Sequence, residues 1–489
     1  MAFPAQDFAP YLWRQSDAEP GVFVRRGAGG EAFEDFCNRA IYGEQNLFLG
    51  VHLKLAKPVD AAVLLRAFRS AWISLRFVIP TLALETKQDA ADNTLLVYKV
   101  AKDLADVTLW AERTAQLVET STDLDEIRAN ACTRTLPDAA GDQTFIYLVP
   151  QASTTEYGVL LQTHHTPFDG GATKIVMTRF LEILSTYIDN EALAQKHVSS
   201  LSWGKETDNL LPAYTKVVAS TEPLSGPAYD QTLGAIMGGF GHHLPRQHGY
   251  KKRGEGLGVS RRIEHKFSKE ESERIVASAR ASGFTVNHIV HAAAYLSALH
   301  DNPDVKDDAS FFVFGLADCR GRLAPPYNEP LGYPGYCLGI SGVAVPLSQV
   351  KGEDRKAQLR SIAEVIKVEY AAQKAHPALL GVVAQEVELF LHHVKTGPPP
   401  APWMGPWYAG DGIGERYLHP VYKDAEGKDA ITITDYFTSL KQVQPGPYVR
   451  SYSWGGSLTI SLDFNDAAMP LADCEGILQD IIQSIRTIV

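Results

Sequence analysis

Hydrophobic and polar residues follow two different periods in the first half of the chain. Residues 44–55 (EQNLFLGVHLKL) alternate as in a strand, and residues 58–76 carry apolar side chains at helical spacing. Residues 144–150 and 157–163 predict two more strands joined by a polar turn, and residues 172–188 predict a strongly amphipathic helix. The first half therefore mixes strands with helices.

The second half repeats this mixture after a less regular stretch. Residues 191–260 include a glycine-rich, basic run and predict a crossover segment. Regular patterns then predict strands at 261–267, 310–321, 430–440 and 456–465, and helices at 268–283, 285–300 and 471–489. We expect an α/β (α+β) fold of two similar sandwich lobes, with 1–190 as the N-terminal lobe, 191–260 as the crossover and 261–489 as the C-terminal lobe.

Composition narrows the class of protein. A chain of 489 residues favours two domains, and its net charge of -11 argues against a nucleic-acid-binding role. The sequence shows neither an apolar run of the ~18 residues that a membrane span needs nor a secretory signal. Its five cysteines are scattered without a C-x-x-C pair, which favours a reducing compartment and no zinc site. We expect a cytoplasmic enzyme without a metal.

One motif carries most of the chemistry. His164 and His165 end an apolar strand, and Asp169 and two glycines, Gly170 and Gly171, precede the helix at 172–188. A pair of hydrogen-bonded histidines at a strand end is the alternative interpretation. The two glycines permit a tight bend, and a neutral imidazole suits a general base at cellular pH. The other two His-His pairs of the chain lack the following Asp-Gly.

Other catalytic motifs are missing from the sequence. It contains no G-x-S-x-G elbow, no H-E-x-x-H helix and no P-loop. A histidine base without a protein nucleophile indicates direct attack of one substrate on another.

The His-His-x-x-x-Asp-Gly motif resembles that of the chloramphenicol acetyltransferase-like superfamily, which includes peptide-synthetase condensation domains. Residues 67–80, 281–299, 316–347 and 456–466 are similar to other parts of these proteins, so the resemblance covers most of the chain. The D-F-G-W-G loop of plant-type members is absent. The pattern looks most like the fungal trichothecene 15-O-acetyltransferase group.

This resemblance implies a channel between two chloramphenicol acetyltransferase-like lobes, which acetyl-CoA enters from one mouth and a hydroxylated acceptor from the other. It implies an O-acetyltransferase that acts on a secondary metabolite such as a terpenoid, with His165 as catalytic base and His164 in support. Asp169 and Gly170 complete the motif, and we predict that Asp169 is structural and pairs with Arg76. A condensation-like cyclase, a carrier-protein-dependent condensing enzyme and a non-catalytic ligand-binding relative are the alternatives. We expect a monomer.

Two further sets of residues are candidates. Relatives carry a small polar residue near Ser439 and Thr438, which makes these two candidate oxyanion donors, with an ordinary strand end as the alternative. An acidic protein needs a local basic patch for the phosphates of coenzyme A, and the candidates are Lys251, Lys252, Arg253, Arg320 and Arg322. The alternatives are a solvated loop for the first three and a structural ion pair for Arg320.

Overall fold

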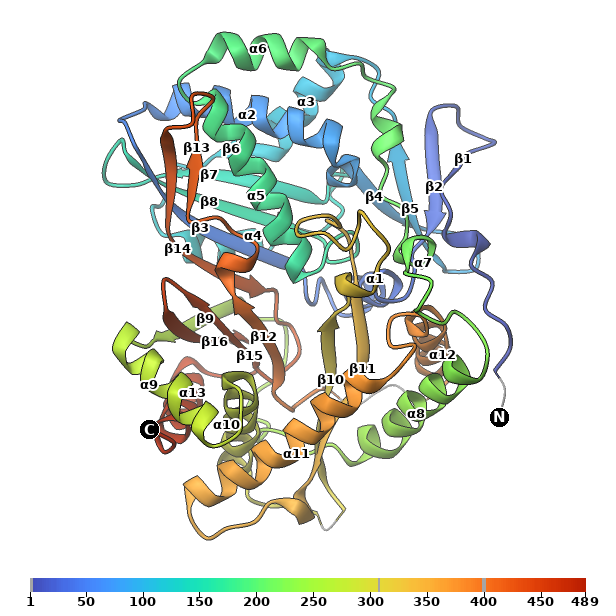
Figure 1. Cartoon of the computed structure of the whole chain (residues 1–489), viewed down its shortest axis with the longest axis vertical. Helices are drawn as coiled ribbons and strands as arrows, with labels where there is room; N and C mark the ends of the chain where they lie inside the picture. The colour runs from blue at the N-terminus through green and yellow to red at the C-terminus, as the bar shows by residue number, and fades with distance from the viewer. Residues whose placement is uncertain (1–2, 307, 398–401) are drawn as a thin grey trace.

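The structure is a computed structural model that describes residues 3–306, 308–397 and 402–489, and it forms two lobes (Figure 1). The N-terminal lobe is built on a six-stranded sheet in the order β13-β14-β3-β8-β7-β6. Its strands are β3 (Leu47–Leu55), β6 (Ala115–Leu117), β7 (Thr144–Pro150), β8 (Glu156–Thr163), β13 (Val421–Lys423) and β14 (Asp429–Leu440). The helices of this lobe are α2 (Ala61–Val78), α3 (Leu104–Thr114), α4 (Leu124–Ala131), α5 (Gly170–Tyr187) and α6 (Glu191–Ser200).

A smaller sheet lies beside this lobe and leads into the first helix. Its order is β1-β2-β5-β4, and its strands are β1 (Arg14–Gln15), β2 (Val22–Arg26), β4 (Leu84–Gln88) and β5 (Thr94–Lys99). Helix α1 (Gly30–Ala40) follows β2 and lies between the two lobes in Figure 1.

The C-terminal lobe contains a four-stranded sheet and a separate hairpin. The sheet has the order β12-β15-β16-β9, with β9 (Ser260–Lys266), β12 (Trp407–Ile413), β15 (Tyr448–Trp454) and β16 (Ser457–Asn465). The hairpin pairs β10 (Ser310–Asp318) with β11 (Leu338–Pro346). The helices are α7 (Tyr214–Val217), α8 (Pro227–His243), α9 (Lys269–Ala281), α10 (Val286–Asp301), α11 (Arg355–Ala375), α12 (Val383–Thr396) and α13 (Leu471–Arg486).

The two-lobe α/β fold predicted from the sequence is confirmed, and most predicted elements form where the patterns place them. The predicted helix at 172–188 corresponds to α5, and the strands at 144–150 and 157–163 correspond to β7 and β8. Helix α9 begins at the Ser268 cap, whose side chain accepts from the Glu271 backbone N–H.

The crossover segment is more regular than predicted, because it contains the 17-residue helix α8. Its glycines suggested a loop, and each costs a helix about 1 kcal/mol relative to alanine. Burial of one apolar face outweighs this cost. That face is formed by Tyr229, Leu233, Ile236 and Phe240, which recur at helical spacing.

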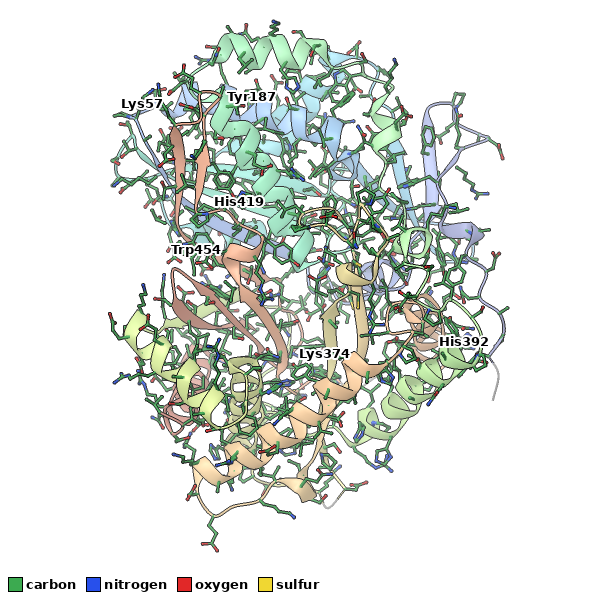
Figure 2. The ribbon with its side chains drawn as sticks, viewed as in Figure 1. Lys57, Tyr187, Lys374, His392, His419 and Trp454 are labelled. Carbon is green, nitrogen blue, oxygen red and sulfur yellow. The ribbon has the colours of Figure 1, made fainter. Side chains whose placement is uncertain are left out.

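Strand β14 comes from the second half of the sequence and joins the N-terminal sheet. It falls in the sequence range predicted for the C-terminal lobe, yet it pairs antiparallel with β3 and extends the N-terminal sheet. Tyr436 of β14 packs against Trp454 of β15, with ring centroids 5.4 Å apart, and Figure 2 labels Trp454 where the lobes meet. The second half of the chain therefore supplies a strand to the N-terminal sheet, and side chains such as Tyr436 and Trp454 also join the lobes.

No described helix has both the length and the apolar composition needed to cross a bilayer.

Candidate active site

The turn after β8 holds the two histidines of the motif deep between the lobes. His164 is fully buried, and its Nδ1 accepts a hydrogen bond from the Thr166 backbone N–H at 3.0 Å. The Thr166 hydroxyl donates in turn to the carbonyl of Glu31 on α1 at 3.2 Å. Burial lowers the pKa of His164 to about 3. His164 therefore braces the turn as a neutral side chain.

His165 is 7% exposed and is the more accessible of the two rings. Burial lowers its pKa to about 4, although backbone groups and the charge of Asp169 oppose this shift. The imidazole is neutral at cellular pH, as a general base must be. Its Nε2 lies 3.8 Å from Oε1 of Glu34.

Asp169 is the N-cap of α5 and joins the lobes. The prediction that it pairs with Arg76 is wrong. Its Oδ1 accepts from the Ala172 backbone N–H at 2.7 Å and from Nη2 of Arg320 at 2.7 Å. Its Oδ2 accepts from the Cys337 backbone N–H at 2.8 Å. The predicted partner, Arg76, instead stacks its guanidinium 4.7 Å from the Trp110 ring centroid. Because Arg320 is 151 residues away in sequence, local pattern could not identify it.

The glycines of the motif leave room for this ion pair. A Cβ on Gly171 would lie 2.8 Å from Nη1 of Arg320, which is closer than side chains pack. A Cβ on Gly170 would meet the Asp411 carboxylate at an ordinary 3.6 Å. Gly171 is therefore the position that the close approach requires.

Two residues beside His165 were not predicted from the sequence. Glu34 on α1 is buried, and the Tyr336 hydroxyl donates to its Oε1 at 3.3 Å. The ring centroids of Tyr336 and His165 are 5.6 Å apart. Burial raises the pKa of Glu34 to about 8, although the bond from Tyr336 opposes the shift. Glu34 is therefore mainly a neutral carboxylic acid at pH 7.

Helix α1 can place Glu34 there because Tyr336 packs onto a glycine. A Cβ on Gly30 would lie 2.1 Å from the Tyr336 ring. The sequence signal was the run GEAFEDF, in which acids and phenylalanines share one short helix. Such a run usually marks a half-exposed helix, whereas α1 buries Glu31, Glu34 and Asp35.

The two candidate oxyanion donors already donate to carboxylates. The Ser439 hydroxyl donates to Asp463, and the Thr438 hydroxyl donates to Asp411 at 2.9 Å. Arg450 joins both acids, at 3.0 Å from Asp411 and 3.5 Å from Asp463. Neither hydroxyl has a second proton to offer, so these contacts do not support the predicted role.

Four of the five basic candidates for coenzyme A form ion pairs. Arg320 is buried and also donates to two backbone carbonyls, and Arg322 pairs with Glu222. Arg253 pairs with Asp301 and Asp473, and Lys252 pairs with Glu255. The structural alternative for Arg320 is therefore the one that the contacts support. Lys251 is exposed on its loop.

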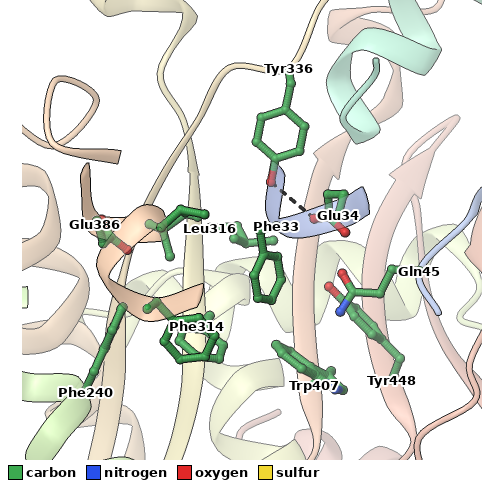
Figure 3. A pocket seen from close by; sticks show the side chains of 13 residues that line it. Phe33, Glu34, Gln45, Phe240, Phe314, Leu316, Tyr336, Glu386, Trp407 and Tyr448 are labelled. Carbon is green, nitrogen blue, oxygen red and sulfur yellow. Dashed lines mark hydrogen bonds between the residues drawn. The ribbon is translucent and has the colours of Figure 1, made fainter. Parts of the chain in front are cut away.

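An apolar pocket begins at the residues that contact His165. Glu34 and Tyr336 line one side of it, and Glu386 of α12 lies on the other side (Figure 3). The remaining wall is largely aromatic and aliphatic, with Phe33, Phe240, Phe314, Leu316, Ile340, Val387, Phe390, Trp407 and Tyr448, and Gln45 adds an amide. Such a lining suits an apolar ligand that carries a few oxygens.

A second opening, the basic groove, lies along the opposite end of α1. We define it by its three cationic residues, Arg39, Arg134 and Lys441, which line one cavity together with neutral and acidic side chains. Arg39 pairs with Asp35 and Asp92, each at 3.0 Å, and Arg134 pairs with Asp138 at 3.7 Å, whereas Lys441 forms no ion pair within the described residues. The two openings thus differ in polarity.

Comparison with known proteins identifies the family of this chain. A family model described as 15-O-acetyltransferase Tri3 matches residues 4–323. Trichothecene 15-O-acetyltransferase TRI3 of Fusarium sporotrichioides is 25% identical over 99% of this chain and 97% of its own length. Trichothecene O-acetyltransferase TRI3 of Trichoderma arundinaceum is 21% identical over 94% of this chain and 93% of its own.

Solved structures share the fold. The F. sporotrichioides TRI3 structure superposes with a TM-score of 0.87 at 20% identity, covering 99% of this chain and 100% of that one. The first condensation domain of the calcium-dependent antibiotic synthetase gives a TM-score of 0.61 at 12% identity, covering 95% and 96%. Since the Tri3 model spans well over half of the 489 residues, the protein is an O-acetyltransferase that belongs to the 15-O-acetyltransferase Tri3 family.

Proposed function

We propose that the protein transfers an acetyl group from acetyl-CoA to one hydroxyl of a trichothecene, a fungal terpenoid, with His165 as general base. The observation that carries the proposal is a buried, neutral His165 whose two neighbours, Glu34 and Tyr336, line an apolar pocket. The printed names of the relatives support the substrate class. A cytoplasmic location and a monomeric state stay predictions.

The proposed reaction needs one proton to move twice. Nε2 of His165 accepts the hydroxyl proton while the acceptor oxygen attacks the thioester carbonyl carbon. The tetrahedral oxyanion then collapses and the carbon–sulfur bond breaks. The imidazolium returns the proton to the thiolate sulfur, which leaves free coenzyme A and the acetate ester. Such general-base catalysis contributes about 10²–10⁴-fold.

Glu34 fits this reaction as a neutral acid. A carboxylate beside His165 would destabilise the oxyanion by charge repulsion, whereas the protonated carboxyl favoured by burial adds no negative charge. Its proton can also be donated to an acceptor oxygen, because a protonated carboxyl is both donor and acceptor.

Acetyl-CoA fits the basic groove better than the apolar pocket. Phosphates require cations, and the pocket offers two acids, Glu34 and Glu386, and no basic residue. The groove offers Lys441, which has no ion-pair partner among the described residues, and the ion-paired Arg39 and Arg134. We therefore assign the coenzyme to the groove and the acceptor to the pocket.

The test combines product formation with one variant of the base. Wild-type protein given acetyl-CoA and a trichothecene with a free 15-hydroxyl should release thiol and form the acetate ester. His165→Ala should lower kcat at least 100-fold without a change in thermal stability. Near-wild-type turnover by a folded His165→Ala protein would disprove the base, and transfer from a carrier-bound acyl group alone would favour the condensing alternative.

The coenzyme assignment has its own variants. Lys441→Glu and Arg134→Glu should raise KM for acetyl-CoA strongly and leave KM for the acceptor unchanged, with an effect that shrinks at high salt. Lys356→Glu, an exposed charge reversal on α11, is the matched control. A larger effect from Lys251→Glu than from the groove variants would restore the earlier assignment to the crossover.

A further inference from the structure

Glu386 is a buried acid without a partner. It lies on α12 with an exposed fraction of 1%, and its Oε2 is buried without a hydrogen-bond partner among the described residues. Glu388, two residues further on, accepts from the hydroxyl of Tyr11 at 2.7 Å and pairs with Arg26 at 3.3 Å. The helix therefore satisfies one acid and leaves the other unsatisfied.

The surroundings of Glu386 offer no charge to balance it. It faces the apolar pocket, where its neighbours include Phe240, Phe314, Leu316 and Phe390. Burial raises its pKa well above the usual range of a glutamate. A neutral carboxyl in this position can both donate and accept one hydrogen bond.

A leucine at this position would be the more stable choice. An unsatisfied buried polar group destabilises a protein, and replacing it by an apolar side chain removes that penalty. Buried polar groups normally have hydrogen-bond partners, and Glu386 is an exception. Such an exception in a pocket that leads to His165 is typical of a residue that contacts a ligand.

Figure 3 shows Glu386 and Glu34 on opposite sides of the pocket, with Phe33 and Leu316 between them. A molecule whose reacting hydroxyl lies beside Glu34 and His165 would extend its apolar body past these side chains toward Glu386. We propose that Glu386 is a specificity-determining residue that hydrogen-bonds to a second oxygen of the acceptor, remote from the hydroxyl that is acetylated. This inference rests on the proposed function.

Other ligands fit the position less well. The phosphates of coenzyme A would meet two acids and no cation. A metal ion would need several ligands, and within the described ranges no group of three or more His, Cys, Asp or Glu residues could hold one. A neutral oxygen of an apolar molecule matches a protonated carboxyl.

The experiment compares acceptors that differ by one oxygen. The probes are a trichothecene with a free 15-hydroxyl and a set of analogues that each lack one of its other oxygens. The wild type should discriminate against one analogue by roughly 10- to 100-fold in kcat/KM, as expected for one buried hydrogen bond. Glu386→Leu should lose that discrimination, Glu386→Gln should keep part of it, and Glu388→Gln should keep all of it.

Two further readouts separate a ligand contact from a structural role. Glu386→Leu should unfold at a higher temperature than the wild type, whereas loss of a structural residue would lower that temperature. Acceptor binding without acetyl-CoA, followed by fluorescence of the pocket residue Trp407, should weaken for Glu386→Leu with the parent acceptor but not with the sensitive analogue.

The outcomes distinguish the inference from the function on which it rests. If the wild type binds the acceptor but transfers no acetyl group, the proposed function fails, and a weaker Glu386→Leu complex still supports the contact. If the wild type acetylates every probe, and Glu386→Leu changes kcat/KM equally for all probes or for none, the proposed contact is refuted. If the wild type binds no probe, both fail.

Discussion

Breaking the ion pair between Asp169 and Arg320 should destabilise the whole molecule. Asp169→Asn keeps a side chain that can cap α5, since asparagine is as good an N-cap as aspartate. The substitution removes the negative charge opposite the buried Arg320 guanidinium. It also places an amide N–H, which cannot accept a hydrogen bond, opposite one of two donors: Nη2 of Arg320 or the Cys337 backbone N–H. Only Asp318, at 3.1 Å and 42% exposed, would then balance Arg320.

The size of the stability loss expected for Asp169→Asn follows from the burial of the ion pair. Asp169 is 0% exposed and the Arg320 side chain 8%, and removing one partner of such a pair costs about 3–5 kcal/mol. Because Asp318 retains part of the charge balance, we expect the lower end, about 3 kcal/mol. A lobe-sized cooperative unit loses about 2–4 °C in Tm per kcal/mol, so Asp169→Asn should lower Tm by roughly 6–12 °C.

Differential scanning calorimetry of a double-mutant cycle provides the assay. Asp169→Asn and Arg320→Met should each destabilise strongly, and the double variant should be at least ~1 kcal/mol more stable than the sum predicts. Arg261→Met, which removes a half-exposed pair with Asp466, is the control and should cost less than ~1 kcal/mol. Additive effects within ~0.5 kcal/mol, or a Tm shift no larger than that of the control, would refute the reasoning.

Three other predictions follow from burial and packing. The acid limb of the kcat/KM profile should lie near pH 4, because burial lowers the pKa of His165 from 6.5 to about 4, and a limb near pH 6.5 would contradict this. Glu34→Gln should raise Tm at pH 8 but not at pH 5: the folded pKa of about 8 exceeds the unfolded value of 4.5, so Glu34 costs stability as pH rises through this window. Equal Tm shifts at pH 5 and pH 8 would contradict the raised pKa of Glu34. Gly30→Ala should cost about 1–3 kcal/mol in urea unfolding, because its Cβ would clash with the Tyr336 ring, whereas exposed Gly238→Ala on α8 should be neutral or stabilising. A stabilising Gly30→Ala would overturn the packing argument.

Local patterns predicted what is locally determined. The strand before His164 and the helix after Gly170 follow from hydrophobic period and turn chemistry over some 30 residues. Helix α8 was missed because glycines obscure its apolar row, although Leu233, Ile236 and Phe240 carried the signal. The spacing of buried residues was the better guide there than composition.

Partners from distant segments could not be predicted in the same way. Arg320 reaches Asp169 through the turn after β10, and Tyr336 reaches Glu34 from the loop before β11. Nothing in the sequence indicates that a buried acid lacks a partner, so Glu386 becomes visible only when its surroundings are known. The family motif predicted the base, and the tertiary fold showed the residues around it.

On the ribosome, β3 is complete long before the strand that covers its edge. The chain finishes β8 at Thr163 and begins β14 at Asp429, so about 260 residues must be translated in between. At ~5–20 residues per second this takes roughly 13–50 s, during which the apolar edge of β3 can pair with another nascent chain. Aggregation during synthesis should therefore depend on translation speed and chaperone supply. A chain that stops before residue 429 would leave this edge of β3 without its partner strand.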